Sequence, residues 1–573
     1  MHKTFPLRFC VLLVPAMLLN ACAGMPEARE PAASSHPLAR MSVPVDDTES
    51  RAMSQLLQAE FALADGDTSS AARAYAQAAA TSRDVRVAEA SASLAMQTGN
   101  PAEAQSAIDR MQATGADPLA LARERARLAL LRGHRDEARA QLQKVLAPGD
   151  DKAWRSFARL LAEARDPALA GTLLEELANA RTLPPDRSDM WVAMSQLGEK
   201  LNRHIYAEQL ADEAASRFGD ARAYAWAAHL KMAAGQETEG LAQYARAVAD
   251  DPDNVRLRLI YAAALSQADR NRDALKVLRA GPQTLDTLIG QAAYAARLDD
   301  QGEIARVYAE LVKHRTQYDR NIDFLLGQLA ETLDKPRQAL DYYRAVPQSD
   351  EHAFEAVVRQ AVLLDQSGDK TRAHALAAGL QRDYADDKDS LQRAFLLDAQ
   401  LYVLDGRQDQ AVATYSRGLE KLPDDTDLLY GRALSEADRG NTKAAIADLR
   451  KVLELKPGDV DAMNALGYTL ADENRNLEEA DTLLRRALEH KPDEPAIIDS
   501  WGWLKYRQGD LAAAEKALRK AWDMRKDPDI GVHLGEVLWH QGRREEARKV
   551  FAEVRKDDPH NAALAKTLKR LEK

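Results

Sequence analysis

The residues of this chain that could do chemistry are few, and their spacing does not favour catalysis. His533 and His540 lie seven residues apart, which is two helical turns and too far for both side chains to bind one metal ion. Carboxylate pairs such as Asp250–Asp251 and Asp386–Asp387 fall at expected turns, and we interpret them as solvated charge. The HExxH, GxSxG, phosphate-loop and EF-hand patterns are absent from the sequence. We therefore expect no catalytic residue, no metal and no cofactor; hydrolysis of peptidoglycan by the isolated chain would overturn this expectation.

Composition restricts the remaining classes of protein. The 573 residues include 46% hydrophobic and 29% charged ones, so most of the chain should fold. Acidic residues outnumber basic ones by 89 to 78, for a net charge of −11, and no basic stripe is visible, so a nucleic-acid partner is not expected. Alanine and leucine dominate and aromatics are 6%, which favours helices over a β-sandwich or barrel. Two cysteines exclude a disulfide-stapled scaffold.

The elements that must position any functional side chain form an internal repeat. One small residue recurs fifteen times, with a mean spacing of about 34 residues. We expect each of these anchor residues early in the second helix of a helix pair. The anchors are Ala71, Ala104, Ala138, Ala170, Ala207, Gly240, Ala274, Ala305, Ala339, Ala373, Ala411, Ala445, Ala480, Ala514 and Ala547.

The period and the residues around each anchor resemble the tetratricopeptide repeat, a unit of two antiparallel helices. Gly467 and Gly535 stand where the two helices of such a unit cross closely. Glycines five residues before an anchor, such as Gly509, are expected to end the first helix in the left-handed conformation. Prolines such as Pro457 and Pro492 are expected to stop the second helix.

This resemblance implies an all-α fold, a tetratricopeptide-repeat superhelical solenoid of some fifteen helix-turn-helix units with a long concave groove. Residues 51–391 are expected to form degenerate repeats, 392–560 consensus-like repeats and 561–573 a C-terminal capping helix. A coiled coil is the alternative for helices rich in Ala, Leu, Glu and Arg, but the glycines and prolines that return with each repeat would interrupt its heptads.

The groove is the expected working surface. By the same resemblance, positions 2, 5, 9 and 12 of each first helix line it, and exposed aromatic residues there are natural anchors for a peptide. The sequence leaves open whether Trp503 and Trp539 face the groove or pack between repeats, and it predicts that Trp501 packs between them. The groove lacks the Lys/Asn/Arg set of carboxylate-clamp repeats, so a cochaperone role is not inferred. The predicted partner-binding residues are Tyr430, Asn464, Tyr468, Asp499, Trp503, Tyr506 and Trp539.

The N-terminus is typical of a targeting signal rather than of a folded domain. Residues 1–21 hold basic residues and then an apolar run of eleven residues, too short to span a bilayer. The following Leu19-Asn20-Ala21-Cys22 resembles the lipobox of bacterial lipoproteins, which implies cleavage before Cys22 and its acylation. Ala23, in place of the Asp associated with inner-membrane retention, favours the periplasmic face of the outer membrane. Residues 22–50, with four prolines, are expected to be a disordered tether.

The C-terminal repeats resemble one family more closely. The stretches NALGYTLADENRNLEEADTLLRRALEHKPDEPAIIDSWGWLKYRQGDLAAAEKALRKAW (464–522) and HLGEVLWHQGRREEARKVF (533–551) look like outer-membrane lipoproteins that act as adaptors of periplasmic carboxyl-terminal-processing proteases. The resemblance implies a non-catalytic scaffold without a small-molecule substrate. Such a scaffold binds and helps activate the protease and presents substrate proteins such as peptidoglycan hydrolases.

A second hypothesis remains open beside this one. Other tetratricopeptide lipoproteins serve as scaffolds for exopolysaccharide secretion or pilus assembly. Gene neighbourhood would separate the two, because a lone locus favours the adaptor and a polysaccharide operon favours the export scaffold.

Overall fold

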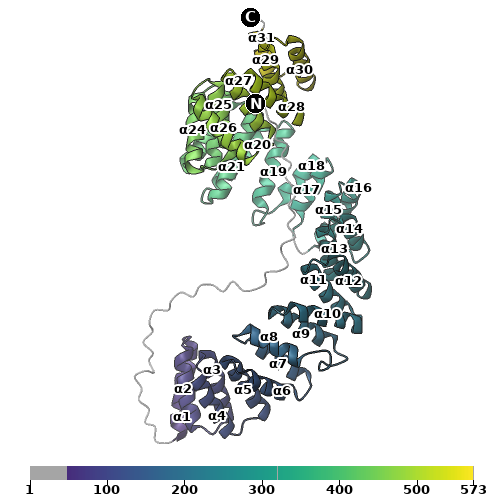
Figure 1. Cartoon of the computed structure of the whole chain (residues 1–573), viewed down its shortest axis with the longest axis vertical. Helices are drawn as coiled ribbons and strands as arrows, with labels where there is room; N and C mark the ends of the chain where they lie inside the picture. The colour runs from purple at the N-terminus through teal and green to yellow at the C-terminus, as the bar shows by residue number, and fades with distance from the viewer. Residues whose placement is uncertain (1–47, 319–320, 572–573) are drawn as a thin grey trace. The chain divides into compact units, whose positions relative to one another are not determined.

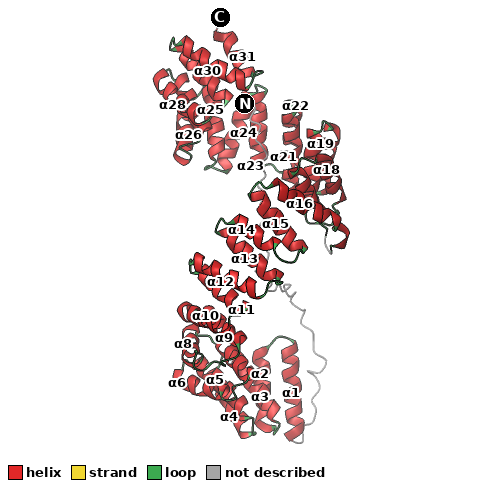
Figure 2. Ribbon diagram, turned by 90° about the vertical axis from the view of Figure 1, so that its right-hand side faces the viewer, coloured by secondary structure: helices red, strands yellow, loops and turns green. Residues whose placement is uncertain are grey.

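The computed structural model describes residues 48–318 and 321–571 of the chain. Within these ranges every regular element is a helix and no strand occurs (Figure 2). This confirms the predicted all-α fold of helix–turn–helix units. The signal segment, Cys22 and residues 23–47 lie outside the described residues, so acylation of Cys22 stays a prediction. The first helix begins at Thr48, inside the segment 22–50 that was expected to be a tether.

The described chain divides into two compact units, residues 48–307 and residues 308–571, each built of stacked antiparallel helix pairs (Figure 1). The helices of the first unit are α1 (Thr48–Ala64), α2 (Thr68–Thr81), α3 (Val85–Thr98), α4 (Pro101–Ala113), α5 (Pro118–Arg132), α6 (Arg135–Leu146), α7 (Asp151–Ala162), α8 (Pro167–Leu177), α9 (Ser188–Lys200), α10 (His204–Phe218), α11 (Ala221–Ala233), α12 (Glu237–Asp250), α13 (Val255–Gln267), α14 (Asn271–Arg279) and α15 (Leu285–Arg297). Helix α16 (Gln301–Lys313) contains the boundary between the units.

The second unit continues the same order. Its elements are the short 3-10 helix η2 (Arg315–Gln317), α17 (Asp323–Thr332), α18 (Pro336–Ala345), α19 (Ala353–Gln366), α20 (Lys370–Asp383), α21 (Lys388–Leu404), α22 (Gln408–Lys421), α23 (Thr426–Asp438), α24 (Thr442–Leu455), α25 (Val460–Asp472), α26 (Leu477–His490), α27 (Pro495–Arg507), α28 (Leu511–Met524), α29 (Pro528–His540), α30 (Arg544–Asp557) and α31 (Ala562–Leu571). Each odd-numbered helix up to α29 is the first helix of a pair, and the following even-numbered helix is the second.

All fifteen predicted anchors lie on second helices, and every one except Ala305 is buried. Ala305 is half-buried on α16. Small side chains at these positions let a neighbouring helix approach closely, and the larger residues around them fill the space between helices. The repeat spacing is therefore the spacing of close helix contacts along the chain.

Two glycines inside first helices confirm the predicted close crossing within a pair. A Cβ at Gly467 of α25 would lie 2.6 Å from Cγ of Leu484 on α26. A Cβ at Gly535 of α29 would overlap the ring of Phe551 on α30. Leu484 and Phe551 are themselves 0% and 3% exposed, so neither side chain has free space to move into. The side chain of the second helix thus occupies the volume that the glycine leaves open.

The turn between the helices of a pair contains a left-handed residue in every described pair except α7–α8. Gly509 has φ of +84° and lies five residues before the anchor Ala514, where the sequence predicts a left-handed residue after the first helix. Repeats without this glycine use another residue at the same place: Asn202, Asp269 and Asp334 have φ of +59°, +56° and +53°. Asn and Asp are the residues besides Gly that tolerate this conformation best. These three degenerate repeats keep the turn geometry although they lose the glycine.

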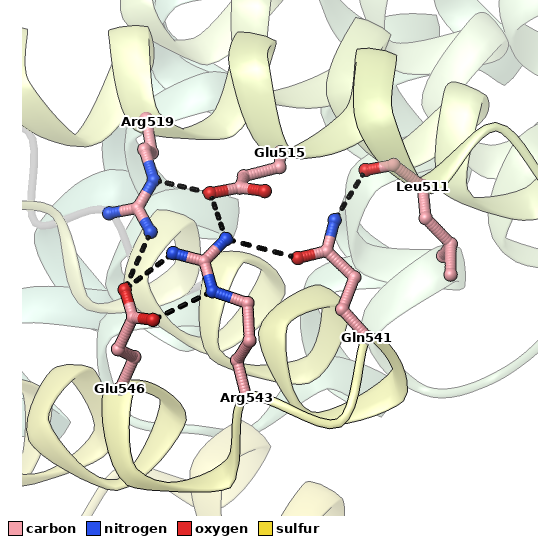
Figure 3. A network of polar contacts seen from close by, with 6 residues as sticks. All are labelled: Leu511, Glu515, Arg519, Gln541, Arg543 and Glu546. Atoms are coloured by element: carbon pink, nitrogen blue, oxygen red, sulfur yellow. Dashed lines mark hydrogen bonds and ion pairs between the residues drawn. The ribbon is translucent and has the colours of Figure 1, made fainter.

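First helices of each unit pack against one another along the chain, as α25, α27 and α29 do. Second helices are joined by polar contacts at the ends of the pairs. Figure 3 shows one such network between α28 and α30, in which Arg543 contacts Glu515 (2.6 Å) and Glu546 (2.6 Å). Arg519 contacts the same two carboxylates at 2.7 Å and 3.1 Å. These partly exposed ion pairs connect neighbouring repeats and add little stability each.

Candidate functional site

The seven predicted partner-binding residues all lie on first helices of the second unit. They are Tyr430 on α23, Asn464 and Tyr468 on α25, Asp499, Trp503 and Tyr506 on α27, and Trp539 on α29. Because these helices pack side by side, residues that are one repeat apart in sequence come into contact. The structure brings Tyr468, Asp499, Trp503 and Tyr506 into one cluster, and the other three are not part of it.

The centre of this cluster is His533 of α29. Its Nδ1 lies 2.9 Å from Oδ1 of Asp499, and its imidazole stacks on the indole of Trp503 with ring centres 4.2 Å apart. The hydroxyl of Tyr468 lies 3.4 Å from Nε2 of His533. His533 and Asp499 are only 9% and 7% exposed. Three successive first helices therefore contribute to one buried arrangement of rings and charges.

Trp503 is buried between repeats and does not lie open on a groove. It is 3% exposed, and its Nε1 donates a hydrogen bond of 3.1 Å to the carboxylate of Asp472 at the end of α25. This settles one of the two alternatives that the sequence left open for Trp503. A buried indole with a satisfied N–H is a core residue, so Trp503 holds α25, α27 and α29 together.

A second chain of contacts connects the cluster to the last helix. The hydroxyl of Tyr506 donates to Glu536 of α29 at 3.0 Å, and Arg570 of α31 pairs with the same carboxylate. Glu536 is 2% exposed. A carboxylate buried to this degree needs charged or polar partners, and α31 supplies the charged one.

The charges around His533 favour its protonated form. Burial opposes protonation, but the carboxylate of Asp499, with smaller contributions from Asp529 and Asp472, outweighs burial and raises the pKa of His533 above its ordinary value. His533 and Asp499 therefore form a buried ion pair over a wider pH range than an exposed histidine would.

The tyrosines of the cluster stay protonated. Burial, reinforced by the nearby carboxylates Asp472 and Asp499, raises the pKa of Tyr468 well above its usual value. Burial and Glu536 raise the pKa of Tyr506 to about 12. Neither phenol can act as an anionic nucleophile or base at neutral pH, so both serve as hydrogen-bonding groups.

Three predicted residues make no polar or ring contact with the cluster within the described chain. Tyr430 is half-buried on α23, and the buried side-chain oxygen of Asn464 has no hydrogen-bond partner among the described residues. Trp539 is half-buried, with the guanidinium groups of Arg544 and Arg548 at 5.2 Å and 5.9 Å from its ring centre. Trp501, which was expected to pack between repeats, is half-buried too and is covered by the ammonium of Lys505 at 4.0 Å.

Three members of the cluster are not among the residues predicted from the sequence. His533 was considered there only as a metal-ligand candidate, and Glu536 and Arg570 were not connected to Tyr506. A usable signal exists in the spacing, because His533 follows Asp499 by 34 residues and Arg570 follows Glu536 by 34 residues. Residues one repeat apart occupy equivalent positions on neighbouring helices, so complementary charges at this spacing predict contact.

The described residues offer no arrangement for metal chemistry. Across residues 48–318 and 321–571, no group of three His, Cys, Asp or Glu side chains is placed to hold a metal ion. The carboxylates of the cluster are engaged by His533, Trp503, Tyr506 and Arg570. In the same part of the chain no helix has the length and apolarity needed to cross a membrane.

Two segments of the chain match family models of the tetratricopeptide repeat, residues 430–495 and residues 505–571. Both segments lie in the unit that carries the His533 cluster. Together with the stacked helix pairs, these matches define the class of fold: residues 430–495 and 505–571 form tetratricopeptide repeats.

Among characterised relatives, the chain is 36% identical over 213 residues to the TPR repeat-containing protein PA4667 of Pseudomonas aeruginosa. This match covers 37% of the chain and 35% of PA4667, so it spans about a third of that relative. The chain is also 31% identical over 127 residues to the bacteriophage adsorption protein A of Escherichia coli, covering 22% of the chain and 12% of that protein.

Two solved structures resemble parts of this chain. A tetratricopeptide repeat protein from Parabacteroides merdae is 16% identical and covers 46% of this chain and 99% of its own, with a TM-score of 0.37. The type IV pilus biogenesis factor PilW is 18% identical and covers 38% of this chain and 100% of its own, with a TM-score of 0.32.

Proposed function

We propose that this chain is a lipid-anchored adaptor on the periplasmic face of the outer membrane. In this role it binds and activates a carboxyl-terminal-processing protease and presents protein substrates such as peptidoglycan hydrolases to it. One observation supports the proposal most directly: the stretch that resembles such adaptors, 464–551, lies largely within the two segments that match tetratricopeptide-repeat models. The same stretch carries most of the buried cluster around His533.

The cluster supports a binding role because it fixes the first helices before any partner arrives. Association costs free energy for every side chain or loop that must be ordered on binding. The contacts of His533 with Asp499 and Trp503 hold α27 and α29 in one arrangement. A partner protein therefore meets a surface that is already ordered, on which half-buried Tyr506 and Trp539 present part of their rings.

The physical mechanism of an adaptor is effective concentration. A scaffold that holds a protease and its substrate at once converts their encounter into an intramolecular event, which raises avidity without a new contact. A lipid at Cys22 would confine the scaffold to the membrane surface as well. The protease supplies the catalytic groups, and this chain holds the protease and its substrate close to each other.

A reconstituted cleavage assay tests the proposal. The purified chain alone is expected to leave a candidate hydrolase intact, and its addition is expected to raise the initial rate of cleavage by the carboxyl-terminal-processing protease of the same organism. The variant Trp539→Ala is expected to weaken this stimulation. Trp501→Ala is the matched control, because Trp501 is half-buried too but is covered by Lys505. An unchanged cleavage rate on addition of the chain would refute the adaptor role.

The anchor has its own test. Labelling of cells with a palmitate analogue is expected to mark the chain and to leave the variant Cys22→Ser unmarked. Membrane capture of the chain, followed by identification of co-purified proteins, separates the two envelope roles. Recovery of polysaccharide-export or pilus proteins in place of a protease would favour the export scaffold.

A further inference from the structure

The first described helix carries an apolar stripe that faces solvent. Met53, Leu57 and Phe61 of α1 recur every four residues, so they lie on one side of the helix. They are 59%, 52% and 46% exposed. The buried residues of α1, Ala52 and Ala59, lie on the opposite side of the same helix. Helix α1 therefore has two apolar faces, and only one of them is used inside the fold.

The position of α1 explains why its second apolar face is open. The inner face packs on α2, the other helix of the first pair (Figure 1). A later first helix such as α3 also packs on the pair before it, through α2, whereas no described pair precedes α1. The end of a repeat array normally has a polar outer face, because an apolar one would associate with other molecules. The stripe departs from this rule, which indicates a surface that something covers.

The size of the stripe argues against a second copy of this chain as the occupant. Three side chains that are about half exposed offer roughly 300 Å². A stable interface between two proteins buries about 800 Å² on each partner. A membrane surface needs no such area when the chain is already held beside it, because a tether keeps the local concentration high.

The chain that precedes α1 favours a lipid surface. Residues 23–47 separate Cys22 from Thr48, where α1 begins. A flexible chain of about 25 residues has an r.m.s. end-to-end distance of roughly 28 Å. An acyl chain on Cys22 would thus hold α1 within reach of the bilayer. The described helix that is nearest to this anchor in the sequence is the one that carries the exposed stripe.

The charges of α1 indicate the kind of membrane contact. Its charged residues are Glu49, Arg51 and Glu60, and all three are exposed. Two acids and one base give the helix a net charge of −1, which does not attract anionic headgroups. A helix of this kind binds an interface by burying side chains such as Leu and Phe at the boundary of the acyl chains. The contact should therefore depend little on salt or on anionic lipid.

We propose that α1 docks on the surface of a phospholipid bilayer through the stripe of Met53, Leu57 and Phe61. The helix lies along the surface, and these three side chains enter the boundary between headgroups and acyl chains. The inner face of α1 keeps its contacts with α2. The proposal rests on the lipid anchor at Cys22, which supplies the local concentration. Two contacts, the lipid and the helix, give the first unit a defined orientation toward the membrane, which a tether alone does not.

Photo-crosslinking on vesicles tests the proposal. Cys22 is the only cysteine from residue 22 onward, so the chain that begins there can be coupled through this thiol to a maleimide lipid. The vesicles consist of phosphatidylethanolamine and phosphatidylcholine, and p-benzoylphenylalanine stands in place of Phe61. Irradiation is expected to give lipid adducts at position 61. Their yield should stay within about twofold in about 0.5 M NaCl, or when phosphatidylglycerol is added, because the contact is apolar.

The matched control places p-benzoylphenylalanine at Ile205 of α10, which is 75% exposed but lies outside the stripe. It is expected to give roughly tenfold fewer lipid adducts than position 61. Combining Met53→Gln with Leu57→Gln is expected to lower the yield at position 61 by a similar factor, because two apolar side chains no longer enter the bilayer. Glutamine is a good helix former, so α1 still folds in this variant.

The site of crosslinking distinguishes the occupants of the stripe. Adducts to residues 23–47 or to a second copy, in place of lipid, would overturn the proposal. Equal lipid adducts from positions 61 and 205 would overturn it too, since they would reflect proximity to the vesicle and not docking. The maleimide link replaces the acyl chain, so this result does not depend on acylation of Cys22 in cells. Palmitate labelling of cells can therefore fail while docking is confirmed, and the reverse.

Discussion

His533 on α29 and Asp499 on α27 form a buried ion pair that joins two successive repeats, with 2.9 Å between Nδ1 and Oδ1. The two residues are 34 positions apart, so the repeat period itself brings them together. The imidazole of His533 stacks on the ring of Trp503 at 4.2 Å and lies 5.8 Å from the ring of Tyr468, and both members of the pair are buried. The stability of the last repeats should therefore depend on the charge of one histidine.

This dependence gives a prediction about pH. The pKa of His533 is raised in the folded chain above its unfolded value near 6.5. Its contribution is therefore complete below pH ~6.5 and is lost as the pH rises through the folded-state pKa. We expect hydrogen exchange in α27 and α29 to accelerate over this interval, after correction for the intrinsic exchange rate.

The control for this prediction is a comparison of two histidine variants. His533→Gln should remove the pH dependence and destabilise the last repeats by about 1–3 kcal/mol, because Asp499 is left buried without its partner. His490→Gln, at an exposed position at the end of α26, should change neither the pH dependence of exchange nor the stability of the last repeats. A parent chain whose exchange shows no dependence on pH beyond the intrinsic rate would contradict the role of the pair.

The two tryptophans of the predicted surface should respond differently to truncation. Trp503→Ala removes a side chain that is 3% exposed and should cost about 3–5 kcal/mol of stability, as large core truncations do. Trp539→Ala removes a half-buried ring and should cost under about 1 kcal/mol. Urea unfolding measures both changes. Similar destabilisation by the two variants would disagree with the burial of Trp503.

Close helix crossing predicts the effect of a single methyl group. Gly467→Ala places a Cβ 2.6 Å from Leu484 and should destabilise the chain by roughly 1–3 kcal/mol through overpacking. Gly458→Ala is the matched control in the preceding turn, because nothing lies within 4 Å of its Cβ. It should stay within about 0.5 kcal/mol of the parent chain. Thermal unfolding that ranks the two variants equally would rule out steric crowding at Gly467.

The last helix should be needed to keep Glu536 buried. Arg570→Gln leaves Glu536, 2% exposed, with Tyr506 as its remaining partner and should destabilise α29 to α31 by about 1–3 kcal/mol. Lys569→Gln changes the neighbouring exposed charge, which has no partner among the described residues, and should have little effect. Hydrogen exchange confined to these helices reads out the difference, and equal protection in both variants would show that Arg570 is dispensable.

Much of the fold could be predicted because the residues that define the repeat act over short distances along the chain. The anchors, the glycines five residues before them and the prolines after the second helices each act within one helix pair. The degenerate repeats were harder to recognise, since Asn202, Asp269 and Asp334 replace the glycine in the left-handed turn. These residues tolerate the same left-handed conformation, so the helix pair forms although the consensus glycine is missing.

The candidate site was predictable only in part. The spacing of positions 2, 5, 9 and 12 in each first helix placed Tyr468, Asp499 and Trp503 on one face of their helices. The structure brings these three residues together. It also shows that Trp503 belongs to the core and that His533 completes the arrangement. Whether an aromatic ring faces the groove or packs between repeats depends on the neighbouring repeat. The periodicity of a single helix contains no information about that neighbour.

The sequence by itself determined the class of this protein: paired helices, their boundaries and the repeat period follow from residue types that act over a few positions. The tertiary structure alone decided which polar groups are satisfied. The pairing of His533 with Asp499 and the contact of Arg570 with Glu536 depend on how one repeat packs on the next. The physical reason is that conformational preferences act locally, whereas burial and charge pairing are properties of surfaces that meet only after the chain has stacked.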